Sequence, residues 1–237
     1  MDLEFTGECF IPGKAPKRIE DDHLERYRFA CRYAEGKTVL DIACGVGYGA
    51  KLMAEAGALR VDGVDLSPAH IAYAKEHHAA ANVRFLAGDI RTFRAGTPYD
   101  VVVSFETIEH VPEYRAALAS LHALLRPGGT LLISSPNRPL ASPKAKSLAD
   151  KPGNKFHAQE FTIDELTQEL LSAGFQANRS NVFGQRQQRL LRPKVLMRLY
   201  NSLLKPGERF SPVVTRVDSL APRYFILVAM KQGAAGP

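Results

Sequence analysis

The stretch Leu40-Asp41-Ile42-Ala43-Cys44-Gly45-Val46-Gly47-Tyr48-Gly49 follows a short apolar run that begins at Thr38 and opens a helical pattern that extends to Ala58. Its glycine-rich turn therefore lies between the end of a predicted strand and the start of a predicted helix. Such turns bind nucleotides in several folds, because glycines let the backbone and a helix N-terminus approach the ligand closely. The turn by itself predicts a nucleotide-like ligand without saying which one.

Strands and helices alternate on the C-terminal side of this turn. Helices of about 10–15 residues between short apolar strands indicate βαβ units and a parallel sheet. The sequence therefore predicts an α/β fold. The expected strands are residues 38–42, 60–65, 83–87, 100–105, 130–134, 175–183 and 224–230, and the expected helices are residues 21–33, 48–58, 67–80, 112–125 and 162–173.

The turn also distinguishes between two classes of cofactor. Asp41 follows the apolar core of the strand, where a carboxylate would repel the pyrophosphate of a dinucleotide. The same carboxylate suits a ligand with a cationic end, such as an ammonium or a sulfonium group. The glycines are spaced Gly-x-Gly-x-Gly rather than in the dinucleotide register. The turn therefore favours S-adenosylmethionine, and an NAD-dependent enzyme remains a third alternative.

Two further carboxylates follow predicted strands. Asp65 comes 20 residues after Gly45, where an acid accepts both ribose hydroxyls of a nucleoside, and Asp89 lies where a side chain meets an adenine edge. Open α/β sheets bind ligands at the carboxyl ends of their parallel strands. Three carboxylates in register with a glycine turn predict one nucleoside site.

Residues 35–135 resemble the class I, seven-stranded S-adenosylmethionine-dependent methyltransferases. Leu40–Gly47 is similar to their first motif, Gly63–Ser67 to their acidic loop and Gly88–Ile90 to their adenine-side motif; Asp100–Glu106 and Leu125–Leu131 complete the set in order. The one departure is Ala43, where the family most often has glycine.

The resemblance implies a Rossmann-like, mainly parallel seven-stranded sheet with helices on both faces and an antiparallel last strand. It also implies S-adenosylmethionine as the cofactor, with S-adenosylhomocysteine as the product. The cofactor-binding residues that it implies are Asp41, Ala43, Gly45, Gly47, Asp65, Leu66, Asp89, Ile90, Phe105 and Glu106. Tyr27 and Arg28 lie on the predicted N-terminal helix, which we expect to close over the cofactor, with Arg28 reaching the cofactor's carboxylate.

The flanking segments resemble bacterial methyltransferases of surface-glycan and natural-product biosynthesis, and the core is also similar to ubiquinone-pathway O-methyltransferases. The segments that carry the first likeness are Gly7–Gly13, His23–Ala30, Pro136–Arg138 and Phe156–Phe161. This resemblance implies a small-molecule or glycan acceptor. Transfer to a hydroxyl is the leading expectation, N-methylation is its nearest rival, and a non-catalytic cofactor-binding scaffold is the alternative from another class.

A hydroxyl acceptor needs a base, and two histidines are candidates because imidazole titrates near neutral pH. His110 follows the fourth predicted strand, and His157 belongs to the loop that similar enzymes fold over the acceptor. Each histidine also has a simpler interpretation, as a helix cap or a loop anchor. No acidic cluster at the strand ends predicts a metal site, so we expect none.

The net charge of +6 is concentrated in one segment. Between Gly184 and Arg216 there are eight basic residues and one acid, so this segment carries +7 and the rest of the chain −1. Apolar residues at helical spacing within residues 189–205 predict a basic amphipathic helix. We expect a lid or homodimer helix, with contact to a membrane surface or to a phosphate-bearing acceptor as the alternatives; sparse aromatic residues disfavour nucleic acid.

Composition limits the remaining possibilities. The chain has 237 residues, of which 45% are hydrophobic, and its three cysteines form no CxxC pair. These features exclude a disulfide scaffold and a structural zinc module, and no signal peptide or membrane span is evident, so we expect a cytoplasmic protein. We expect one methyltransferase domain over residues 1–237, divided into an N-terminal lid (1–35), a cofactor-binding core (36–135), an acceptor loop (136–160), a basic lid insertion (184–218) and a last strand (223–230).

Overall fold

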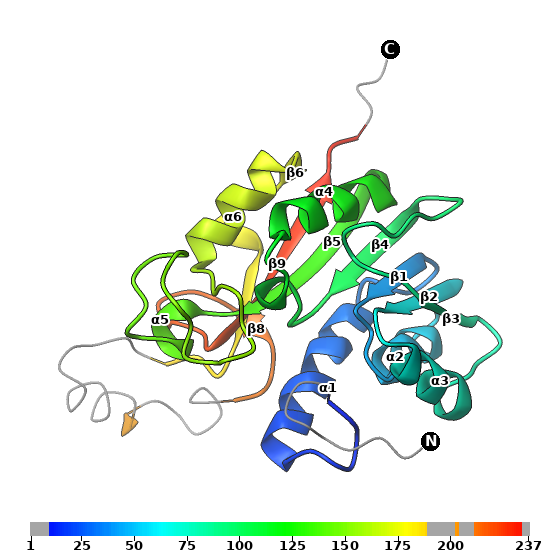
Figure 1. The fold of residues 1–237 in the computed structure, drawn as a ribbon, viewed down its shortest axis with the longest axis horizontal. Helices are drawn as coiled ribbons and strands as arrows, with labels where there is room; N and C mark the ends of the chain where they lie inside the picture. Colours follow the sequence, from blue (N-terminus) through cyan, green and yellow to red (C-terminus); the bar gives the residue numbers. More distant parts are fainter. Residues whose placement is uncertain (1–9, 189–201, 204–210, 234–237) are drawn as a thin grey trace.

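A computed structural model of the chain describes residues 10–188, 202–203 and 211–233 (Figure 1). Within these ranges one sheet has the strand order β3-β2-β1-β4-β5-β9-β7-β8, and β6 also pairs with β9. The strands are β1 (Thr38–Ile42), β2 (Arg60–Asp65), β3 (Val83–Ala87), β4 (Tyr99–Ser104), β5 (Leu125–Pro136), β6 (Phe175–Gln176), β7 (Val182–Gln185), β8 (Thr215–Arg216) and β9 (Tyr224–Lys231).

The sheet confirms the predicted fold class. Strands β1 to β5 pair in parallel, whereas β9 runs antiparallel to both β5 and β7. The longer strands form the predicted Rossmann-like arrangement, and β6 and β8 add only two residues each.

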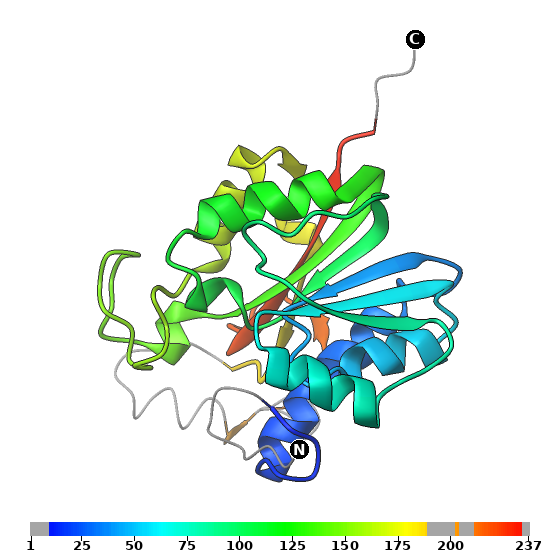
Figure 2. The same cartoon turned by 45° about the vertical axis from the view of Figure 1, so that its right-hand side comes forward.

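Helices cover both faces of the sheet. Figures 1 and 2 show α1 to α3 on one side and α4 and α6 on the other. The α-helices are α1 (Lys17–Cys31), α2 (Tyr48–Glu55), α3 (Pro68–His77), α4 (Tyr114–Leu124), α5 (Arg138–Ala141) and α6 (Ile163–Ser172), and the 3-10 helices are η1 (Ile108–His110) and η2 (Arg179–Asn181).

Alternation along the strands divides the core between these two layers. Val39, Val101 and Val103 pack with residues of α1 and α2, whereas Leu40 and Val102 pack with residues of α4 and α6. All five side chains are buried. Burial of an apolar side chain of this size stabilises the fold by about 1.5–3 kcal/mol, so the central strands, apolar on both faces, hold the two helical layers together.

Local signals place two of the helices where the sequence predicts them. The hydroxyl of Ser67 accepts a hydrogen bond from the His70 amide at the start of α3, and Pro68 is the first helical residue. Thr162 and Glu165 form a reciprocal capping box at the start of α6. Such caps satisfy backbone amides that have no partner within the helix.

Three predicted elements differ from the structure. The strand expected over residues 175–183 is broken by η2, where short polar side chains favour a turn, and Ser180 donates a hydrogen bond to Asn178. The strand expected over residues 130–134 begins earlier, at Leu125 of β5: Leu125 pairs with Tyr99, and the register shifts before Thr130 pairs with Val101. The acceptor loop predicted over residues 136–160 contains α5.

The predicted basic helix over residues 189–205 lies outside the described residues except for 202–203. Within the part of the chain that the structure describes, every helix is too short or too polar to cross a membrane.

Candidate active site

A cavity of about 410 Å³ opens at the carboxyl ends of β1, β2 and β4, between these strand ends, α1 and the loop after α5. It brings together most of the site residues predicted from the sequence. Those that line it are Tyr27, Ala43, Gly45, Asp65, Phe105, Glu106, His110 and His157.

The glycine turn has the left-handed backbone that its glycines permit. The φ angles of Gly45 and Gly47 are 56° and 86°, and that of Ala43 is 63°. A non-glycine residue pays about 1–2 kcal/mol in this region, which is a physical reason why related enzymes have glycine where this chain has Ala43. Gly47 is the N-cap residue of α2 and does not line the cavity; it packs against Phe85, and a Cβ there would lie 2.6 Å from that ring.

Asp65 joins the end of β2 to the glycine turn. One carboxylate oxygen accepts a hydrogen bond of 2.8 Å from the Gly45 amide, and the other accepts one of 2.9 Å from the Ser67 amide. The Nδ1 atom of His70 lies 3.1 Å from the second oxygen. These contacts fix the carboxylate at the wall of the cavity, while each oxygen retains lone pairs for a ligand hydroxyl.

Asp41 is fully buried under a residue of α1. The Tyr27 hydroxyl donates to both Asp41 oxygens, at 3.0 and 3.2 Å, and burial raises the pKa of Asp41 to about 7. Tyr27 lines the cavity and Asp41 does not. Asp41 therefore contacts Tyr27, a residue of the cavity wall, and its predicted contact with the cofactor stays a prediction.

Gly49 is the third glycine of the turn and is absent from the predicted cofactor-binding residues. A Cβ at this residue would lie 2.1 Å from the Tyr27 ring, inside any permissible contact distance. The third glycine of the turn thus makes room for the tyrosine that covers Asp41. The available signal was the Gly-x-Gly-x-Gly spacing.

The structure places Arg26 of α1 in the cavity wall, whereas the cofactor role predicted for Arg28 stays a prediction. Arg28 is exposed, forms an ion pair with Glu25 and does not line the cavity. Arg26 is 2% exposed, lines the cavity and donates a hydrogen bond of 2.7 Å to Gln185 of β7. Asp22 and Arg26 lie four residues apart on one helix face, and this spacing was the missed signal.

Three other predicted cofactor residues lie away from the described cavity. Leu66 is largely exposed, and Ile90 packs in the core. Asp89 binds Arg91, whose guanidinium lowers the pKa of that carboxyl, and Arg91 also reaches Glu113. Their roles on the adenine side remain predictions.

The end of β4 carries two predicted residues to the cavity. Phe105 packs edge-on against the Tyr27 ring, with 5.3 Å between centroids. Glu106 adopts a positive φ of 48° and accepts a 2.7 Å hydrogen bond from Ser134, while its amide donates to the same hydroxyl. A strained backbone held by two hydrogen bonds fixes the direction of this carboxylate.

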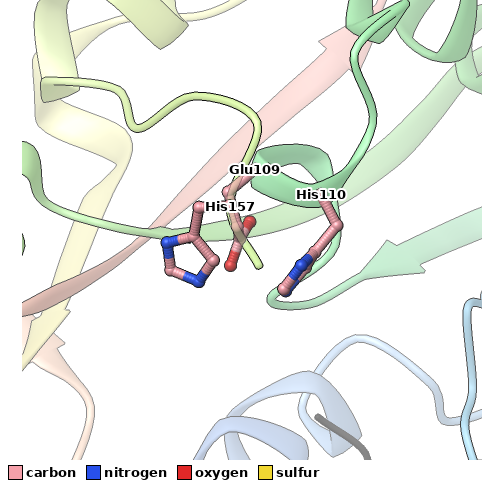
Figure 3. A group of neighbouring side chains, drawn as sticks. All are labelled: Glu109, His110 and His157. Atoms are coloured by element: carbon pink, nitrogen blue, oxygen red, sulfur yellow. The ribbon is translucent and has the colours of Figure 1, made fainter. Parts of the chain in front are cut away.

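The two candidate catalytic histidines meet although 46 residues separate them in sequence. Their ring centroids are 4.8 Å apart and their planes nearly perpendicular, and Figure 3 shows them beside Glu109. The Nδ1 atom of His157 lies 2.7 Å from a Glu160 carboxylate oxygen, and that of His110 lies 3.1 Å from the Phe156 carbonyl. Both rings are therefore oriented by fixed acceptors.

Sequence reasoning missed the two buried acids beside these histidines. Glu109 and Glu160 are 1% and 2% exposed, and both line the cavity. Burial raises the pKa of Glu109 well above its usual range, and the carboxyl groups of Glu106 and Glu160 raise it further. Glu109 directly precedes His110, but nothing in the local pattern shows that its side chain points inward.

Comparison with known proteins agrees with this arrangement. A family model described as a methyltransferase domain matches residues 17–180. A probable S-adenosylmethionine-dependent methyltransferase of Mycolicibacterium smegmatis is 37% identical over 177 residues, covering 73% of this chain and 66% of the relative. A ubiquinone biosynthesis O-methyltransferase of Pseudomonas paraeruginosa is 36% identical over 114 residues, covering 46% of this chain and 47% of the relative. The match thus spans at most about two thirds of these relatives' lengths.

Solved structures share the fold. A Burkholderia thailandensis N1-methyltransferase solved with S-adenosylhomocysteine has a TM-score of 0.55 and 23% identity, covering 91% of this chain and 78% of that one. A possible histamine N-methyltransferase of Thermotoga maritima has a TM-score of 0.63 and 17% identity, covering 91% and 92%.

The fold is that of a class I S-adenosylmethionine-dependent methyltransferase. The chain belongs to the methyltransferase domain family, and its cofactor is S-adenosylmethionine. The residues present fit this cofactor: the glycine turn and Asp65 offer a nucleoside wall, and the buried Arg26 offers a cation for a carboxylate.

Proposed function

We propose that this methyltransferase transfers the methyl group to a hydroxyl of a small molecule or glycan, and that His110 and His157 promote loss of the hydroxyl proton. The observation that carries the proposal is the position of both histidines in the wall of the cavity that Asp65 and the glycine turn also line. A cofactor and an acceptor held in one cavity satisfy the proximity that methyl transfer requires.

The cofactor's polar groups have matching partners in this cavity. The Asp65 carboxylate suits the two ribose hydroxyls, because its oxygens keep lone pairs beyond those used by the two amides. Arg26 suits the carboxylate of the methionine part, since a buried guanidinium forms strong charge-assisted hydrogen bonds. Tyr27 and Phe105 provide apolar ring surface between these polar groups.

The reaction needs positioning more than covalent help from the protein. The acceptor oxygen forms a bond to the methyl carbon as the carbon–sulfur bond breaks, and that bond's electron pair remains on sulfur. Holding the reactants in line supplies on the order of 7–11 kcal/mol in well-oriented cases. A neutral hydroxyl is a poor nucleophile, so loss of its proton is the step for which the two histidines are suited.

The first test is calorimetric titration of the full chain with S-adenosylhomocysteine, with NADH as the control. We expect saturable binding of S-adenosylhomocysteine alone. Acceptors bearing hydroxyl, amine or carboxylate groups are then screened with methyl-labelled S-adenosylmethionine. Label recovered as an ether supports the proposal, whereas label recovered only on nitrogen would replace it with N-methylation.

The remaining partner assignments are also proposals. The overall basicity supports contact of residues 189–205 with an anionic membrane surface or a homodimer partner, but that segment lies almost wholly outside the described residues. A cytoplasmic location is the matching expectation for an enzyme that uses S-adenosylmethionine. Sedimentation with anionic vesicles and analytical ultracentrifugation test the two contacts separately.

A further inference from the structure

The group formed by Glu109, His110 and His157 has the composition of a metal site. One potential ligand atom from each residue lies within 4.8 Å of the other two (Figure 3). Two imidazoles and one carboxylate are the donor set of many catalytic zinc sites, in which a fourth position stays open for water or substrate. All three residues line the cavity, so an open position would face its interior.

The histidines are prepared for ligation by their other ring nitrogens. Because the Glu160 carboxylate and the Phe156 carbonyl are acceptors, the Nδ1 atom of each ring carries the hydrogen and donates it. The Nε2 atom of each ring then holds the lone pair that a metal binds. A carboxylate behind a ligating histidine is the usual outer partner in zinc sites, and Glu160 has that place behind His157.

Glu109 gives a second, independent indication that this group of residues binds a cation. Its side chain is 1% exposed, and its Oε2 atom has no hydrogen-bond partner among the described residues. An unpaired buried carboxylate oxygen costs free energy that a cation would recover.

We propose that Glu109, His110 and His157 bind one divalent transition-metal ion of the zinc type at the acceptor end of the cavity. Ligation draws the three atoms from within 4.8 Å to the roughly 3.4 Å that tetrahedral ligands about 2.1 Å from zinc require. The ion takes the Nε2 lone pair of His157 that the Asn154 amide now contacts at 2.9 Å.

The proposal rests on the proposed hydroxyl transfer and specifies how the histidines promote it. The acceptor hydroxyl occupies the open position, and the bound cation lowers the pKa of that hydroxyl as it does for bound water. The O–H proton leaves to solvent water, the oxygen takes the methyl group, and the electron pair of the broken carbon–sulfur bond stays on sulfur. No base other than water is then required.

The test uses the full chain, freed of metal by a chelator, and Co²⁺ as a visible substitute for zinc. We expect cobalt absorption bands that saturate at one ion per chain and disappear when Zn²⁺ is added. His110→Gln and His157→Gln should each weaken binding by more than about 100-fold, and Glu160→Gln by about 10–100-fold, the usual loss for an outer partner.

The control variant is His77→Gln, which removes a histidine on α3 that does not line the cavity. It should bind Co²⁺ like the unaltered chain. The proposal would be overturned if Co²⁺ binding to the unaltered chain did not saturate. It would also be overturned if the His77→Gln and His110→Gln variants bound Co²⁺ with equal affinity. Thermal unfolding checks that each variant is folded, and His110, which is only half-buried, is the substitution least able to disturb the fold.

Titration with S-adenosylhomocysteine separates this proposal from the function on which it rests. Cofactor affinity should be the same with and without the chelator, because Asp65 and the glycine turn are not ligands of the ion. If the metal binds but no hydroxyl acceptor is methylated, the proposed function fails and the metal site stands. If hydroxyl transfer proceeds at full rate in the chelated protein, the metal proposal fails.

Discussion

The two ends of the cavity are built differently. Its cofactor end comes from short contiguous motifs at the ends of β1 and β2, where Gly45 and Asp65 are tied by one hydrogen bond. Its acceptor end joins η1 and the loop after α5, which bring His110 and His157 together from 47 positions apart. A local motif therefore reveals the cofactor, whereas the acceptor chemistry depends on tertiary packing.

The largest expected effect is at the acceptor end. His157→Gln should lower turnover by about 10²–10⁴-fold, the range for loss of a group that assists proton removal, and leave affinity for S-adenosylhomocysteine intact. The measurement is kcat on a hydroxyl acceptor together with calorimetry. A loss of cofactor affinity equal to the loss of turnover would show that the two ends of the cavity are not separate.

Affinity for the cofactor should depend on Asp65 far more than on Asp89. Asp65→Ala removes the acceptor proposed for the ribose hydroxyls, and loss of even one hydrogen bond to a charged group costs about 1.5–3 kcal/mol, so S-adenosylhomocysteine should bind at least about 10-fold more weakly. Asp89→Ala is the matched control, because Arg91 holds that carboxylate away from the cavity. Equal losses in the two variants would restore the adenine-side role that the sequence predicts for Asp89.

Stability should fall as pH rises, through Asp41. Its pKa is raised to about 7 in the folded chain from an ordinary value near 4, so the folded state binds the extra proton between these values. The contribution of Asp41 to the free energy of unfolding therefore declines between about pH 4 and pH 7, by an amount of the order of 1–4 kcal/mol.

Asp41→Asn should flatten that decline in urea unfolding measured across the same pH range. Asp164→Asn is the control, because Asp164 is exposed and paired with Arg179 on the surface. An unchanged slope in Asp41→Asn would mean that the buried carboxyl titrates at its ordinary pKa.

Packing of Tyr27 on the glycine turn should be sensitive to one methyl group. Gly49→Ala places a Cβ 2.1 Å from the tyrosine ring and should destabilise the fold by about 1–3 kcal/mol. Gly96→Ala, which meets nothing within 4 Å, is the control in thermal unfolding. Equal melting temperatures for the two variants would show that the Tyr27 ring does not need the space that Gly49 leaves.

The smallest expected effect is a gain in stability. Ala43→Gly removes a left-handed strain of about 1–2 kcal/mol and costs about 0.5–1 kcal/mol in chain entropy, leaving a net gain of up to about 1.5 kcal/mol. Thermal unfolding measures it, and a lower melting temperature would show that the Ala43 methyl group contributes packing.

The sequence predicted the sheet and the cofactor end because their signals are local: apolar strands, caps at Ser67 and Thr162, and the glycine turn. It predicted a cofactor role for Arg28 and not for Arg26, because the buried face of a helix can be assigned only when its packing partner is known. Glu109 was missed for the same reason. Its side chain becomes part of a site only because the loop that carries His157 lies beside it in the folded chain.

The most direct test of the account is a crystal structure of the complex with S-adenosylhomocysteine. The account predicts ribose hydroxyls on Asp65, the ligand carboxylate on Arg26, and the sulfur atom directed toward His110 and His157. A ligand whose sulfur faces away from the two histidines, or whose ribose binds elsewhere, would contradict the division of one cavity into a cofactor end and an acceptor end.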